Sequence, residues 1–157
     1  MDALTIGPAD PLDTRLDLLF ARHTEFCHAD TPPESIHMMD RAALRAPGIT
    51  FLAAFAGLRA IGMGAVKDLG AGLAELKSMH VLQEARGGGA ARQLLAALID
   101  TARQMGAATL ALETGAQPSF APARAFYRRN GFCDCPPFGS YGHDPMSAFM
   151  RRDLSGA

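Results

Sequence analysis

A strand, a glycine-rich turn, a long amphipathic helix and a second apolar strand follow one another between residues 73 and 114. Apolar side chains recur at helical spacing through residues 88–105, and Gly106 ends this pattern. When a helix connects two consecutive strands of one sheet, the strands lie parallel and the crossover is right-handed. The chain is therefore predicted to contain a parallel strand pair with a helix packed against the sheet.

Shorter connections elsewhere predict antiparallel pairing. The strands at 49–56 and 59–69 are separated by a turn at Gly57, which is typical of a hairpin. With the parallel unit, this predicts an α/β (mixed α+β) fold with a mixed sheet, helices on both faces and the order β-α-α-β-β-β-α-β-α-β-β. The other expected elements are strands at 3–7, 73–81, 107–114, 131–135 and 147–154 and helices at 11–27 and 119–130.

A second helix is expected between the first helix and the hairpin. It would begin at Pro33 or Ser35 and end before Pro47, because proline is tolerated in the first turn of a helix but not in its interior. The apolar residues expected to face inward are Ile36, Met39 and Leu44.

The composition of the 157-residue chain fits one globular domain covering residues 1–157, since 48% of its residues are hydrophobic and 20% charged. A net charge of −1 gives no general attraction to nucleic acid or to an anionic membrane. The acidic N-terminus lacks the basic start of a signal peptide, which predicts a cytoplasmic protein. The three cysteines, Cys27, Cys133 and Cys135, match neither a disulfide framework nor the spacing of zinc ligands, so no metal is expected.

The segment Arg86-Gly87-Gly88-Gly89 lies between a strand and a helix, where each glycine costs about 1 kcal/mol relative to alanine. Such a turn exposes backbone amides beside the positive end of the helix dipole, which favours a bound phosphate or pyrophosphate. The glycines alone are equally consistent with a loop that only packs tightly. A P-loop is not indicated, because no Lys-Ser or Lys-Thr follows, and the dinucleotide fingerprint would need glycine at Arg92.

Two stretches, "ELKSMHVLQEARGGGAARQLLAALIDTARQMGAATLALETG" and "ARAFYRRNGF", resemble the GNAT superfamily of acetyl-CoA-dependent N-acetyltransferases. The family signature Gln/Arg-x-x-Gly-x-Gly/Ala is matched by Arg86, Gly89 and Ala91. A second family mark, a tyrosine followed by x-x-x-Gly-Phe, is matched by Tyr127 and Gly131-Phe132. The resemblance implies a GNAT-like, mostly antiparallel sheet of six or seven strands with a splayed parallel pair.

The resemblance also implies a site for acetyl-CoA. The backbone of Met79, His80 and Val81 would pair with the pantetheine arm, and one amide there would polarise the thioester carbonyl. The family often has a basic residue where this chain has Gly88, which would weaken one phosphate contact. The residues expected to hold the pyrophosphate are Arg86, Gly87, Gly88, Gly89, Ala90, Ala91 and Arg92.

The implied reaction is attack of a free amine on the thioester within one ternary complex, which needs a proton acceptor and a proton donor. Tyr127 is the expected donor to the departing thiolate, although its hydroxyl could instead only stabilise the packing. Glu75 is the expected base, directly or through water, unless it is ion-paired with Lys77. Glu113 and His80 are the alternatives.

Strand alternation places Glu75, Lys77 and Met79 on one face and, on the other, Leu76, Ser78 and His80.

The acceptor pocket is expected near the first helices, which usually flank it in this family. The chain resembles a bacterial GNAT subgroup with the motifs PPESxH, ELKxM, LETG and PFGxYxxDPxSxFM. Ser35 could instead cap a helix, and Tyr141 could belong to an ordered turn. The residues expected to bind the acceptor are Ser35, His37, Lys77, Glu113 and Tyr141.

The expected function is acetyl transfer from acetyl-CoA to a primary amine. A small molecule is the favoured acceptor because the chain has no acidic run that would dock a basic protein tail. Neither a nucleic acid nor a membrane is an expected partner, and a homodimer is possible because this fold often dimerises. The alternatives are a non-catalytic CoA-binding regulatory module and a small phosphotransferase, against which the missing Walker lysine argues.

Overall fold

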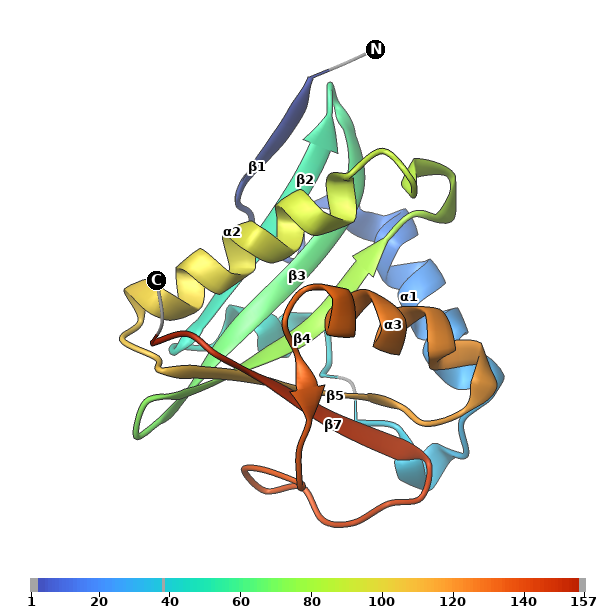
Figure 1. Cartoon of the computed structure of the whole chain (residues 1–157). Helices are drawn as coiled ribbons and strands as arrows, with labels where there is room; N and C mark the ends of the chain where they lie inside the picture. The colour runs from blue at the N-terminus through green and yellow to red at the C-terminus, as the bar shows by residue number, and fades with distance from the viewer. Residues whose placement is uncertain (1–2, 38, 156–157) are drawn as a thin grey trace.

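The computed structural model describes residues 3–37 and 39–155. Its centre is a seven-stranded sheet in the order β1-β2-β3-β4-β5-β7-β6 (Figure 1). Strands β4 and β5 pair in parallel, and all other neighbours in the sheet pair antiparallel. The predicted mixed sheet is confirmed. The strands are β1 (Leu4–Pro8), β2 (Ile49–Ala56), β3 (Arg59–Gly70), β4 (Leu73–Val81), β5 (Thr109–Gly115), β6 (Cys133–Asp134) and β7 (Ser147–Asp153).

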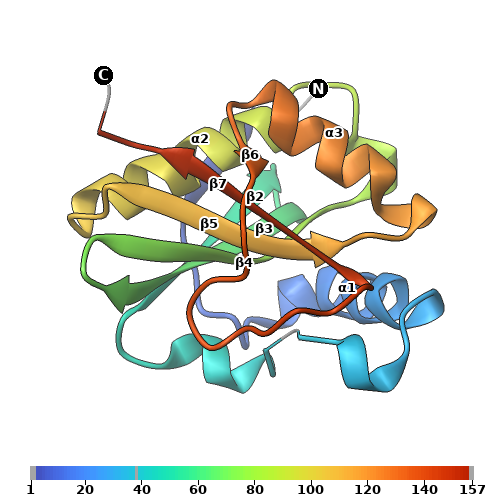
Figure 2. The same ribbon diagram turned by 60° about the horizontal axis from the view of Figure 1, so that its bottom comes forward.

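Helices cover both faces of the sheet, as predicted (Figure 2). Helix α1 (Asp17–Ala29) lies on one face, and α2 (Ala90–Gln104) and α3 (Ala121–Arg129) lie on the other. Short 3-10 turns precede two of the helices, Thr14–Leu16 before α1 and Pro118–Phe120 before α3. Another, Gln83–Ala85, precedes the glycine loop. None of these described helices is long and apolar enough to cross a membrane.

The predicted inward face of the central helix is confirmed. Burying each of its leucines contributes about 1.5–3 kcal/mol, which offsets the glycine-rich start of the helix. Helix α2 packs against Leu52, Val66 and Leu76 of the sheet. The buried residues of α2 on this side are Leu94, Leu95, Leu98, Ile99 and Ala102.

The expected second helix is wrong: the segment contains two 3-10 turns, Pro33–Ser35 and Ala42–Arg45. Residue 38 lies outside the described residues, but Ile36, two positions before it, is extended, with φ −90° and ψ 118°. The apolar pattern explains the error. Met39 and Leu44 are five residues apart, which would place their side chains about 140° apart around a helix with 3.6 residues per turn, on different faces. Leu44 alone of the three predicted positions is fully buried.

Strand β4 contains a bulge at Ser78, whose φ of +55° is unusual for a residue other than glycine. His80 lies opposite Met63 and Lys77 lies opposite Ala65, so β4 spans this interval with one more residue than β3. Met63 and Ala65 both belong to the core on the α1 side.

The bulge changes which side chains share a face. Lys77 and His80 point to the α1 side, whereas Leu76 and Met79 pack on the α2 side. The predicted grouping of His80 with Leu76, and of Met79 with Lys77, is therefore wrong. Strict alternation fails because the extra residue reverses the side-chain direction after Ser78.

Strands β4 and β5 separate beyond the middle of the sheet. Their parallel pairing ends at Leu76 and Leu112, although β4 continues to Val81 and β5 to Gly115. In Figure 1 the two strands diverge toward their carboxyl ends. The splayed parallel pair is confirmed, and the gap between the strands is where the candidate site lies.

Candidate active site

A cavity of about 540 Å³ occupies the gap between the separated strands. Residues 76–81 of β4 and 112–115 of β5 form two of its walls. The glycine loop, α3, α1 and the 3-10 turn at 33–35 supply the other walls. The cavity is in the size range of small-molecule sites and is reached by side chains from both faces of the sheet.

The glycine loop forms one end of this cavity. Gly87 and Gly89 have φ of +90° and +86°, which side chains other than glycine rarely adopt, whereas Gly88 is not in this region. Gly89 is the N-cap of α2 and no side chain caps the helix. The first-turn amides of α2 are therefore available to an anion. The loop residues that line the cavity are Arg86, Gly87, Gly89, Ala91 and Arg92; Gly88 and Ala90 are not among the lining residues.

Open space in front of the loop fits a phosphate group. A Cβ placed on Gly87 or Gly88 would meet no heavy atom within 4 Å. Arg86 is fixed at the entrance because its Nε donates to the carbonyl oxygen of Val81 at 3.2 Å. Room, exposed amides and a positive charge are the features that a pyrophosphate requires.

Arg129 of α3 also lines the cavity, and sequence reasoning missed it. Within the described residues, no ion pair involves Arg86, Arg92 or Arg129. These guanidinium groups are thus available to anions. The sequence signal that could have indicated Arg129 was the basic pair Arg128-Arg129 at the end of α3, directly after Tyr127.

Tyr127 of α3 lines the same cavity with only 9% of its surface exposed. Its ring packs edge-on against Phe126 and Phe132, with centroid distances of 5.5 and 5.6 Å. Burial raises the pKa of Tyr127 well above its ordinary value, so the hydroxyl is protonated at neutral pH. It can act as a hydrogen-bond or proton donor in the cavity.

Glu75 is buried beside the cavity rather than in its wall, with 5% of its surface exposed. Its Oε2 accepts a hydrogen bond from Tyr141 Oη at 2.5 Å and from Lys77 Nζ at 3.1 Å. The ion pair with Lys77 is therefore present. Lys77 lines the cavity. Tyr141 does not line the cavity but contacts Lys77 through its hydroxyl.

Glu113 lines the cavity from β5. Burial raises the pKa of this carboxyl, and the nearby Ser147 hydroxyl and Lys77 ammonium oppose part of that rise. Ser35 and His37 line the cavity from the opposite side. The five expected acceptor residues thus gather at one end of the cavity, four of them in its wall and Tyr141 behind it.

A histidine pair, missed at the sequence level, forms the α1 wall. His23 Nδ1 and His80 Nδ1 are 3.3 Å apart, and Cys27 Sγ is 3.8 Å from His23 Nε2. Burial lowers the pKa of both histidines to about 4, so both rings are neutral at pH 7. The spacing of His23 and Cys27, one helical turn apart, was the available signal. Among the described residues, no group of three or more His, Cys, Asp or Glu side chains could hold a metal ion.

Residues 15–132 match the family profile described as the Acetyltransferase (GNAT) family. This match covers well over half of the chain and includes the glycine loop and Tyr127. The chain belongs to the GNAT family. The GNAT domain and the relatives below establish it as an acetyl-CoA-dependent N-acetyltransferase.

Two curated relatives of this GNAT enzyme match most of its length. The Bacillus subtilis N-acetyltransferase YsnE, described as uncharacterized, is 44% identical over 79% of this chain and 82% of its own. The Azospirillum brasilense IAA acetyltransferase is 39% identical over 98% of this chain and 100% of its own.

Solved structures agree with the fold of the GNAT enzyme. A Klebsiella pneumoniae protein assigned to the acyl-CoA N-acyltransferases superposes with a TM-score of 0.74 at 30% identity, covering 96% of this chain and 97% of that one. A Thermoplasma acidophilum PaiA N-acetyltransferase, crystallised with coenzyme A, gives 0.69 at 20% identity over 96% and 99%. At that identity the second likeness concerns the fold alone.

Proposed function

We propose that this enzyme transfers an acetyl group to a primary amine of a small molecule by direct attack within a ternary complex. The observation that carries the proposal is one continuous cavity, with the anion-binding glycine loop at one end and Glu113 at the other. Tyr127 lines the same cavity. Both substrates can therefore occupy the cavity together.

The glycine loop is the proposed pyrophosphate site, with Arg86, Arg92 and Arg129 as charged contacts. Beyond the end of the parallel ladder, alternate residues of β4 direct their backbone groups into the gap. Met79, His80 and Val81 are the proposed partners of the pantetheine arm. Bound in this way, acetyl-CoA supplies an activated thioester.

Glu113 is the proposed base, in place of Glu75. An alkylamine resembles lysine, with a pKa near 10, so it arrives as an ammonium ion and must lose a proton. Glu113 faces the cavity, and burial raises its pKa toward the range that suits a base. Glu75 is already bonded to Lys77 and Tyr141 and does not line the cavity.

The acceptor is proposed to be small because side chains from three separate segments converge on its end of the cavity. Ser35, His37 and Lys77 line this end, and the loop carrying Tyr141 lies behind it. The A. brasilense relative, named for action on IAA, is consistent with small-molecule chemistry in this branch of the family.

A panel of primary amines, amino acids and basic peptides tests the proposal. Purified enzyme and acetyl-CoA are incubated with each compound, and acetylated products are identified by mass spectrometry. We expect turnover with a small amine, intersecting initial-rate lines and no acetylated enzyme in the absence of acceptor. Tight acetyl-CoA binding without transfer to any amine would contradict the proposal and favour a regulatory CoA-binding module.

Substituting Gly87 by alanine is expected to weaken CoA binding by about tenfold. The cost of a left-handed backbone for a residue with a Cβ is roughly 1–2 kcal/mol, and relief of that strain would move the loop amides. Gly48→Ala is the matched control, because Gly48 has a similar left-handed φ of +84° and open space around it but does not line the cavity. Calorimetric titration with CoA measures both; equal affinities of the two variants would contradict the proposed role of the loop.

A further inference from the structure

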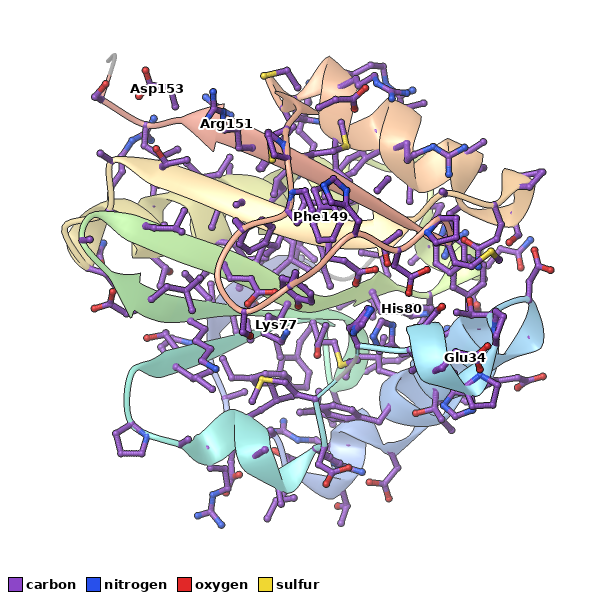
Figure 3. The ribbon with its side chains drawn as sticks, turned by 90° about the horizontal axis from the view of Figure 1, so that it is seen from below. Glu34, Lys77, His80, Phe149, Arg151 and Asp153 are labelled. Atoms are coloured by element: carbon purple, nitrogen blue, oxygen red, sulfur yellow. The ribbon has the colours of Figure 1, made fainter. Side chains whose placement is uncertain are left out.

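The β6–β7 connection, residues 135–146, lies against the acceptor end of the cavity. Figure 3 shows it passing over the sheet, with Phe149 beneath it and Lys77 beside its outer bend. Backbone hydrogen bonds shape the connection: Tyr141 N–H to Phe138 O, Cys135 N–H to Phe149 O, Ala116 N–H to Met146 O and Ser147 N–H to Asp144 O. Its conformation is therefore specific, and the contacts of its side chains can be assigned.

Tyr141 joins this loop to β4. Its hydroxyl donates to Glu75 Oε2 at 2.5 Å, and Lys77 Nζ lies 3.1 Å from both oxygens. The side chains of Glu75 and Lys77 are only 6% and 10% exposed, so solvent screens these bonds little. Charge-assisted hydrogen bonds of this kind are roughly twice as strong as neutral ones.

The same loop reaches the opposite wall of the acceptor end through His37. The Tyr141 ring packs edge-on against His37 at a centroid distance of 5.3 Å, and Asp144 Oδ2 lies 3.7 Å from His37 Nε2. Phe138 and Phe149 pack on the remaining sides of the tyrosine ring, at 5.2 and 5.5 Å. The loop thus contacts both walls of the acceptor end at once.

We infer that Glu75, Lys77 and Tyr141 form a latch that holds loop 135–146 in place and thereby shapes the pocket for the acceptor. Glu75 and Tyr141 are positioning residues, and Lys77 is the member that reaches the cavity. This inference rests on the proposed amine acceptor only for its kinetic consequences. The latch itself is a property of the free enzyme.

Hydrogen exchange of the free enzyme tests the latch without any acceptor. In Tyr141→Phe, which keeps the ring packing and removes one oxygen, we expect the amides of 138–144 and 146 to exchange about tenfold faster, since a hydrogen bond to a charged group is lost. Glu75→Gln should have a similar effect. Glu34→Gln, which alters an exposed carboxylate, is the control.

Kinetics with the best amine of the panel provide the second measurement. Tyr141→Phe and Glu75→Gln should each raise the KM for that amine about five- to tenfold, with kcat within about twofold of wild type. The double variant should be no worse than the more affected single variant, because both act on one bond: phenylalanine removes it, and glutamine removes the charge that strengthens it. The pH profile of kcat should keep its shape.

Two results would overturn the inference. One is unchanged exchange of the amides of 138–144 and 146 in both variants, which would mean that no latch exists. The other is a large loss of kcat and of the acidic limb of the pH profile in Glu75→Gln alone, which would make Glu75 the base. If no amine in the panel is acetylated, the exchange experiment still decides whether the latch exists.

Discussion

Replacing Tyr127 by phenylalanine is expected to lower kcat by about a hundredfold, within the usual range for loss of a general acid. The departing thiolate, with a thiol pKa near 8.5, is stabilised when a neighbouring phenol donates its proton. The substitution removes one hydroxyl and keeps the ring that packs against Phe126 and Phe132. We therefore expect the affinity for CoA and the thermal stability to change little.

Steady-state rates at saturating acetyl-CoA, with calorimetry for CoA affinity, measure this effect. The chain has only two tyrosines, so Tyr141→Phe is a natural control. The control should change the KM for the amine and leave kcat nearly unaltered, the reverse of the pattern expected for Tyr127→Phe. Wild-type kcat in Tyr127→Phe would show that the hydroxyl has only a packing role.

Most of the fold could be predicted because apolar periodicity reports burial directly. The helical spacing of apolar residues in 88–105 predicted α2 and the face that it buries against the sheet, and β2 and β4 have the predicted bounds. The parallel pair followed from connectivity, since a helix between β4 and β5 permits little else. The 3-10 turns at 33–35 and 42–45 were missed because their apolar residues satisfy only part of a helical pattern.

The site was less predictable because two of its features depend on contacts between residues that are distant in the sequence. The bulge at Ser78 reverses the side chains that follow it, and nothing in an alternating strand sequence marks that position. The bond from Tyr141 to Glu75 joins residues 66 positions apart. Sequence reasoning named both residues, Glu75 as the expected base and Tyr141 in the acceptor pocket, but could not place them in contact.

Substituting Glu113 by glutamine is expected to lower kcat by about a hundredfold or more, because the amide cannot accept the ammonium proton. In the wild-type enzyme, kcat/KM should fall as pH decreases through the pKa of Glu113. Burial raises that pKa, so the acidic limb should lie above the ordinary range of a glutamate. In Glu113→Gln this limb should disappear.

Rate measurements across pH with Glu34→Gln as control test this assignment. Glu34 is an exposed carboxylate on the nearby 3-10 turn, so its variant has the same change in net charge and should keep the wild-type profile. If Glu113→Gln keeps both kcat and the acidic limb, another group in the cavity removes the proton. His80 would be the next candidate to test.

The thermal stability of Glu113→Gln provides an independent test of the role of Glu113. Because the pKa of Glu113 is higher in the folded enzyme than in the unfolded chain, the folded form binds more protons between the two values. Its carboxylate therefore reduces the free energy of unfolding as pH rises through this interval, and the penalty persists at neutral pH. Glu113→Gln removes this penalty, so we expect a variant with a much lower kcat and a higher Tm than wild type at pH 7. A simple packing role for Glu113 would give no such gain in stability alongside the loss of activity, so the combination identifies a charge retained for chemistry.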